Sequence, residues 1–175
     1  DWVSDMAWNT PRDWATNEAV TSANMDTYVS DNLSWLGTSR PHGRATDASF
    51  SHTSSGSWLS PAWSTVNTSV GGAVFSAGNG YFTALTAGFY LLGADGTYAA
   101  NATGARGIML SSAANGGGTV YAQNFSPSQS IAVASAVTTG IQLSAFQNVY
   151  VSLVQGSGGT LTITDVHMWA LWETT

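Results

Sequence analysis

The most constraining feature of this sequence is a series of short runs rich in Val, Tyr, Phe, Ile and Thr, separated by clusters of Gly, Asn and Ser, from about Ala62 onward. Such runs are typical of successive antiparallel strands. Turn glycines recur at Asn79-Gly80, at 115–118 and at 156–159, where glycine permits positive φ. The sequence predicts an all-β domain over 62–175 with ten strands, at 63–66, 73–75, 81–85, 88–98, 105–112, 119–124, 130–136, 138–143, 148–155 and 160–172.

Two of these predicted strands are apolar on both faces. Over 88–98, Phe89 and Leu91 alternate with Tyr90 and Leu92, and in the last predicted strand, 160–172, apolar residues likewise fall on both faces. A sheet that only closed its own sandwich would carry polar residues at alternate positions. We expect the second face to meet another subunit; the alternatives are another sheet, the N-terminal segment, or a tolerated exposed surface. The residues expected in the subunit interface or the sandwich core are Phe89, Tyr90, Leu92, Tyr150, Trp169, Leu171 and Trp172.

Charge is scarce and its balance is acidic. Charged residues make up 8% of the chain, the net charge is -6, and the basic residues are four arginines. Phosphate binding depends on clustered cations, so nucleic-acid partners are disfavoured, and a polybasic membrane patch is missing for the same reason. There is no cysteine. Stability must therefore come from packing or assembly, without disulfides.

Residues 1–40 have a different pattern, with four tryptophans and most of the helix-type spacing. Thr10-Pro11-Arg12-Asp13 is a helix start, with a hydroxyl cap followed by proline. From about residue 22, apolar residues recur every three or four positions until Gly37. The sequence predicts a short helical arm with one amphipathic helix over about 22–36, and 41–61 as linker and first strand. The residues expected to pack this helix are Met25, Tyr28, Val29, Leu33 and Leu36.

The segment 81–92, YFTALTAGFYLL, resembles the "F-T-A-P-x-A-G-x-Y-x-F" signature of the tumour necrosis factor and complement globular-head superfamily. The resemblance continues at 106–110, 148–153 and 158–163, and it covers roughly 62–173. Leu85 stands where the signature has proline. The resemblance implies a ten-stranded antiparallel jelly-roll sandwich.

The segment 10–33 resembles the opening "T-P-R-x-W-x-x-x-E-x-V-T-A-A-x-L-N-x-x-V-R-D-N-L" of structural proteins encoded by tailed bacteriophages. Met25, Asp26 and Ser30 depart from that pattern without breaking the amphipathic stripe. This resemblance implies a virion component, such as a capsid decoration or minor tail protein, that joins the arm to a trimeric β head. We expect the arm to anchor the protein to the particle or to a neighbouring subunit, with folding back onto the β domain as the alternative; the anchor residues are Trp2, Trp8, Pro11 and Trp14.

No pattern of residues indicates catalysis, a cofactor or a metal. Asp165 and His167 lie two apart on a predicted strand, but there is no Gly-x-Ser-x-Gly elbow beside them. His42, Asp47 and His52 match no recognised zinc spacing. The remaining carboxylates are too scattered for a glycosidase pair. We therefore predict no catalytic, cofactor or metal site.

These observations favour a non-enzymatic structural protein on the surface of a phage virion. It would form a homotrimer, contact other virion proteins of the capsid or tail, and bind neither nucleic acid nor membrane. The alternative is a receptor- or glycan-binding module of a tail fibre or tip that serves host adhesion, with Tyr121 or Phe125 as stacking surfaces. A hydrolase of surface polysaccharide is a third hypothesis, disfavoured by the missing motifs.

Overall fold

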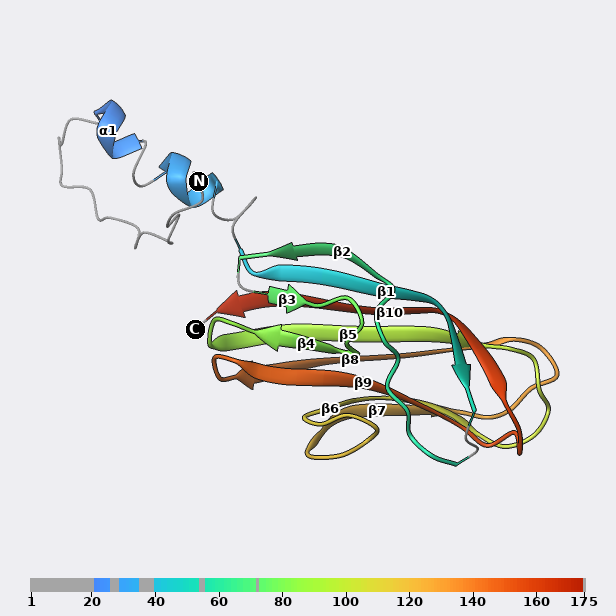
Figure 1. The fold of residues 1–175 in the computed structure, drawn as a ribbon. Helices are drawn as coiled ribbons and strands as arrows, with labels where there is room; N and C mark the ends of the chain where they lie inside the picture. The colour runs from blue at the N-terminus through green and yellow to red at the C-terminus, as the bar shows by residue number, and fades with distance from the viewer. Residues whose placement is uncertain (1–20, 26–28, 35–39, 54–55, 72, 175) are drawn as a thin grey trace. The chain divides into compact units, whose positions relative to one another are not determined.

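The computed structural model describes residues 21–25, 29–34, 40–53, 56–71 and 73–174 (Figure 1). The chain divides into two compact units, Asp1–Arg40 and Pro41–Thr175. The described part of the first unit holds two short helices, α1 (Ser22–Met25) and α2 (Asp31–Ser34). Among the described residues, no helix is long and apolar enough to span a bilayer.

The continuous amphipathic helix expected over 22–36 is not supported by the described residues. The two helices have four residues each, and residues 26–28 and 35–36, which include Tyr28 and Leu36, lie outside the described part. Met25 and Val29 are exposed, and Leu33 is 64% exposed. A helix this short is marginal in water unless its apolar face is buried. The spacing of apolar residues alone was therefore insufficient evidence for a four-turn helix.

The second unit consists of two five-stranded antiparallel sheets (Figure 1). Sheet A has the order β2 (Thr65–Val70), β1 (His42–His52), β10 (Leu161–Thr174), β5 (Gly88–Tyr98) and β8 (Val133–Leu143). Sheet B has the order β3 (Ala73–Phe75), β4 (Tyr81–Ala84), β9 (Gln147–Gln155), β6 (Arg106–Ser111) and β7 (Val120–Ser126).

The pairing of these strands is nested. β1 pairs with β10, β4 with β9, β5 with β8, and β6 with β7. A long hairpin rolled across two sheets gives this order, which is the jelly-roll arrangement. The prediction of an all-β antiparallel sandwich is confirmed.

β1 lies within 41–61, the segment expected to hold the linker and the first strand, and it pairs on both sides, with β10 and β2. Other strand bounds differ from the predicted ones. β8 is one strand, whereas the sequence predicted two strands over 130–136 and 138–143. It continues unbroken because all eleven of its residues pair with the eleven residues of β5.

The core between the sheets is aromatic at its centre. Trp63, Phe75, Phe82, Tyr90 and Tyr98 are all buried there. The hydroxyl of Tyr90 donates to the carbonyl of Thr86 at 2.7 Å, and the hydroxyl of Tyr98 donates to the carbonyl of Gly107. Burial raises the pKa of Tyr90 to about 12 and also raises the pKa of Tyr98, because desolvation disfavours the phenolate.

One cation is buried in the sandwich. Arg106, at the start of β6, is 1% exposed. Its guanidinium nitrogens donate to backbone carbonyls of the preceding turn, at 2.9 Å to Asn101, 3.0 Å to Thr103, 3.1 Å to Ala105 and 3.4 Å to Gly104. Arginine suits this position because its planar fork can satisfy several acceptors at once. The side chain therefore holds the turn between β5 and β6 against the sheet.

Candidate interaction surfaces

The outward side of β5 and β10 carries an unusual concentration of apolar side chains. Tyr90 and Leu92 point into the core, so Phe89 and Leu91 point outward. Leu91 is 37% exposed and Trp169 is 38% exposed, while Phe89 and Leu171 are half-buried. Leu91 lies opposite Leu171 in the β5–β10 register. We call these four side chains, Phe89, Leu91, Trp169 and Leu171, the β5–β10 patch.

Glycines in the sheet let two of the aromatic rings lie directly against it. Gly93 is the register partner of Trp169, and a Cβ added to Gly93 would lie 2.3 Å from Cε2 and Cζ2 of the indole. A Cβ added to Gly140, on β8, would lie 2.5 Å from Cζ of Phe89. A side chain at either glycine would push the neighbouring ring away from the sheet. The patch is therefore flat and pre-formed, which favours binding because little ordering remains.

A β-bulge in β10 sets which side chains reach this face. The register with β5 shifts between Thr164 and His167, and Asp165 has a φ of 53°. Ile163 and Val166 are both fully buried although they are three residues apart. The extra residue therefore leaves Thr164 and Asp165 outside, and it restores the inward alternation that places Trp169 on the outer face.

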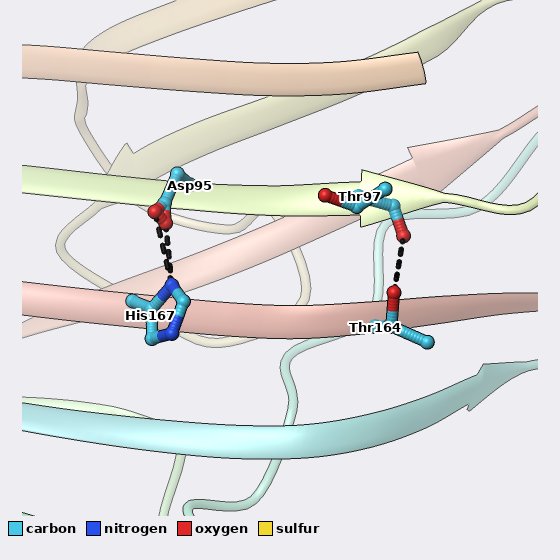
Figure 2. A network of polar contacts seen from close by, with 4 residues as sticks. All are labelled: Asp95, Thr97, Thr164 and His167. Carbon is cyan, nitrogen blue, oxygen red and sulfur yellow. Dashed lines mark hydrogen bonds and ion pairs between the residues drawn. The ribbon is translucent and has the colours of Figure 1, made fainter. Parts of the chain in front are cut away.

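A polar network borders the apolar patch on the same two strands (Figure 2). Nδ1 of His167 lies 2.7 Å and 3.0 Å from the two carboxylate oxygens of Asp95, its register partner on β5. The hydroxyl of Thr164 donates to the carbonyl of Thr97 at 3.5 Å. These groups satisfy each other across the strand pair. They give the outer face of sheet A a polar end beside an apolar one.

The polar pair on this face is not the one that the sequence pattern suggested. His167 has Asp95 as its carboxylate partner, whereas the sequence pattern paired it with Asp165. His42, Asp47 and His52 all lie on β1, and its ends are separated by about 33 Å at roughly 3.3 Å per residue. The described residues contain no group of three His, Asp or Glu side chains placed to hold a metal.

The other residues expected in the interface or core are distributed over three places. Tyr90 and Leu92 are fully buried in the core. Trp172 is half-buried against the core, and its indole nitrogen donates to the carbonyl of Ala87 at 3.4 Å. Tyr150 lies on the outer side of sheet B, where the centroid of its ring is 5.0 Å from that of Tyr81. The four proposed anchor residues, Trp2, Trp8, Pro11 and Trp14, lie outside the described residues.

The two aromatics suggested for ligand stacking have different environments. Tyr121 is half-buried, and its hydroxyl accepts a hydrogen bond from Nε2 of Gln147 at 2.8 Å. Phe125 is 54% exposed and pairs edge-on with Trp58, with ring centroids 5.6 Å apart. Sequence reasoning missed Trp58 because it lies in a Ser- and Gly-rich segment without periodicity. A single tryptophan in such a polar segment was the sequence feature that could have indicated a surface contact there.

Comparison with known proteins identifies the fold. No family model and no curated protein sequence matches the chain. Among solved structures, murine APRIL at pH 8.0 is 12% identical, with 74% of this chain and 98% of that chain covered and a TM-score of 0.54. The globular domain of zebrafish complement 1qA protein is 15% identical (78% and 99% covered, TM-score 0.51). PRD1 vertex protein P5 is 13% identical (78% and 99% covered, TM-score 0.56).

At these identities the comparisons establish the fold alone. The chain has a jelly roll of the kind found in tumour necrosis factor and complement globular domains, as the resemblance at 81–92 implied. The same fold occurs in a vertex protein of a phage. It serves too many purposes to name a function by itself.

Proposed function

We propose that this chain is a non-enzymatic surface component of a phage virion, that its β units associate as a homotrimer, and that residues 1–40 attach the trimer to the capsid or tail. The observation that carries the proposal is the β5–β10 patch. Phe89, Leu91, Trp169 and Leu171 form one outward apolar area on the middle strands of sheet A. Contiguous exposed apolar areas of this kind are typical of subunit interfaces.

A second copy of the same chain is the occupant that suits this patch best. The hydrogen-bonded Asp95–His167 pair lies beside the patch on the same face, so a second copy would meet an apolar end and a polar end, and this asymmetry would restrict its orientation. The resemblance of the arm to phage proteins with trimeric heads supports three copies in the assembly. Burial of the patch between subunits would couple folding to assembly and stabilise a chain without disulfides.

The location on a virion is supported by the segment 10–33, whose pattern resembles phage structural proteins. The fold that the chain shares with PRD1 vertex protein P5 is compatible with such a place. The tryptophans at positions 2, 8 and 14 would supply large apolar areas to a partner on the particle. The protein would then be exposed on the virion surface and, after release, outside the cell.

Particle attachment is tested by adding the full-length chain back to particles that lack it. A Trp2→Ser, Trp8→Ser, Trp14→Ser variant is expected to stay in the supernatant on sedimentation while the unmodified chain pellets with the particles. Ile131→Thr, which alters an exposed residue of the β unit, is the matched control and is expected to pellet. Equal pelleting of the triple variant would contradict the role of the arm.

A second candidate function is binding of a receptor or glycan during host adhesion. The specific observation in its favour is the pair formed by half-buried Trp58, from the β1–β2 connection, and exposed Phe125, on β7 of sheet B. This pair and the β5–β10 patch lie on different sheets, so one molecule has room for both functions.

A further inference from the structure

The outer side of sheet B carries an exposed aromatic corner. Trp58 comes from the connection between β1 and β2, and Phe125 comes from β7. Their ring planes meet at 65° with the centroids 5.6 Å apart. Phe125 is 54% exposed and Trp58 is half-buried. We call this pair the Trp58–Phe125 corner, because its two rings are set at a steep angle to each other.

Each ring of the corner rests on a glycine. A Cβ added to Gly107, the register partner of Phe125 on β6, would lie 2.8 Å from Cδ1 and Cε1 of the phenyl ring. A Cβ added to Gly116 would lie 2.6 Å from Cγ of Trp58. Backbone atoms therefore approach the phenyl ring of Phe125 and the Cβ end of the Trp58 indole closely. The ring of Phe125, which is 54% exposed, is the more accessible of the two.

Hydrogen bonds hold the segment that presents Trp58. The amide of Ser60 donates to Oδ1 of Asn115 at 2.9 Å, and the amide of Asn115 donates to Oγ of Ser60 at 3.0 Å. Oγ of Ser152, on β9, lies 3.0 Å from Oγ of Ser60 and accepts from the amide of Gly116 at 3.0 Å. Leu59 and Leu153 exchange two backbone bonds at 2.9 Å and 2.8 Å. Trp58 is thus fixed before any ligand arrives.

The surroundings of the corner are polar and uncharged. The strands of sheet B and the segments 56–64 and 112–119 contain one charged residue, Arg106, which is buried. Gln123 lies two residues before Phe125 on β7, hence on the same side of the sheet, and it is exposed. Asn115, whose Oδ1 accepts from the amide of Ser60, is also exposed. The corner therefore offers two aromatic faces with amide groups beside them.

These features select one class of ligand. A phosphate-bearing ligand lacks a cation to bind, and the net charge of -6 repels it. A pyranose ring has a face of polarised C–H groups, which suits the negative face of an aromatic ring, and it has equatorial hydroxyls that suit amides at the rim. We propose that the Trp58–Phe125 corner binds a neutral hexopyranose unit of a glycan, which stacks on one ring and contacts the other with its edge.

This proposal gives the second candidate function a defined site and does not depend on self-association through sheet A. Loss of glycan binding and loss of the trimer are therefore separate outcomes. A variant that disrupts one face is expected to leave the other intact.

The test is a titration of the full-length chain with neutral oligosaccharides, followed by saturation-transfer NMR and tryptophan fluorescence. Saturable binding is expected for at least one neutral glycan, with transfer concentrated on ring C–H protons. Phe125→Thr and Trp58→Leu are each expected to weaken binding at least tenfold. Gly107→Ala keeps both rings but displaces Phe125, so it is expected to weaken binding as well. Ile131→Thr, at an exposed position between β7 and β8, is the matched control and is expected to bind normally.

Circular dichroism establishes whether each variant is folded. If Trp58→Leu does not fold, Phe125→Thr still tests the site, because Phe125 is more than half exposed and its replacement is expected to leave the fold intact. The proposal is overturned if no neutral glycan of a broad panel binds the folded wild-type chain. It is also overturned if binding is unchanged in folded Phe125→Thr, or if only anionic sugars bind.

Discussion

Replacement of Trp169 by threonine removes the largest side chain of the β5–β10 patch while keeping a residue that suits a strand. Trp169 is 38% exposed in the single chain. With roughly 250 Å² for a tryptophan side chain, about 95 Å² is available for burial in an interface. At ~25 cal/mol per Å², this area contributes about 2.4 kcal/mol per subunit, or roughly 7 kcal/mol per trimer.

A loss of that size has a measurable consequence. It lowers the trimerisation constant about 10⁵-fold, because each 1.4 kcal/mol is a factor of ten. For three subunits, the total concentration at which half of the chains are assembled varies as the square root of the trimer dissociation constant. This midpoint concentration is therefore expected to rise about 300-fold. Sedimentation velocity over a concentration series measures this midpoint for the wild type and for Trp169→Thr.

The matched control is Ile131→Thr, which removes an apolar side chain that is 64% exposed but lies between β7 and β8, away from the patch. Its assembly midpoint is expected to equal that of the wild type. Near-ultraviolet circular dichroism checks that both variants keep the fold. A folded Trp169→Thr variant whose midpoint stays within threefold of the wild type would refute the assignment of the interface to this face.

Three further predictions concern single positions. Gly93→Ala is expected to weaken assembly although Trp169 is retained, because the new Cβ would lie 2.3 Å from the indole; the same sedimentation series measures it, and an unchanged midpoint would count against a pre-formed patch. Arg106→Met is expected to lower the free energy of unfolding by about 3 kcal/mol, because several buried backbone carbonyls lose their donor. Arg44→Met, at an exposed position, is the control and is expected to change the free energy of unfolding little. Urea unfolding measures both variants. Tyr90 is expected to titrate near pH 12 in an absorbance titration at alkaline pH, and stability is expected to fall as pH rises from 10 toward 12, because the unfolded tyrosine ionises first. Tyr90→Phe is expected to make this fall smaller and to leave the part that comes from Tyr98, whose pKa burial also raises. Titration of all tyrosines near pH 10 would contradict the burial of Tyr90.

The sequence was most informative where side chains are large and turns contain glycine. The alternation of Tyr90 and Leu92 with Phe89 and Leu91 correctly indicated a strand with two apolar faces. β1 was harder to recognise because its inward residues near Pro41 are Gly43 and Ala45, which hydropathy does not mark. Gly43 is required there, since a Cβ would lie 2.8 Å from the ring of Phe75.

Long-range register explains what the sequence could not predict about the surfaces. Asp165 is close to His167 in the chain, but the β5–β10 pairing brings Asp95 to the histidine. Trp58 and Phe125 are 67 positions apart, and they meet only because the segment with Trp58 crosses sheet B beside β9. Such partners depend on the topology, which no local pattern encodes.

Sedimentation equilibrium of the full-length wild-type chain is the most direct test of the central claim, which is self-association as a trimer through sheet A. The account predicts a mass three times the 18.2 kDa of the chain in the micromolar range, with protection of the β5 and β10 side chains from chemical footprinting in the assembled state. A mass of one chain at every concentration, or a trimer in which Trp169 and Leu91 remain as reactive as in the monomer, would contradict it.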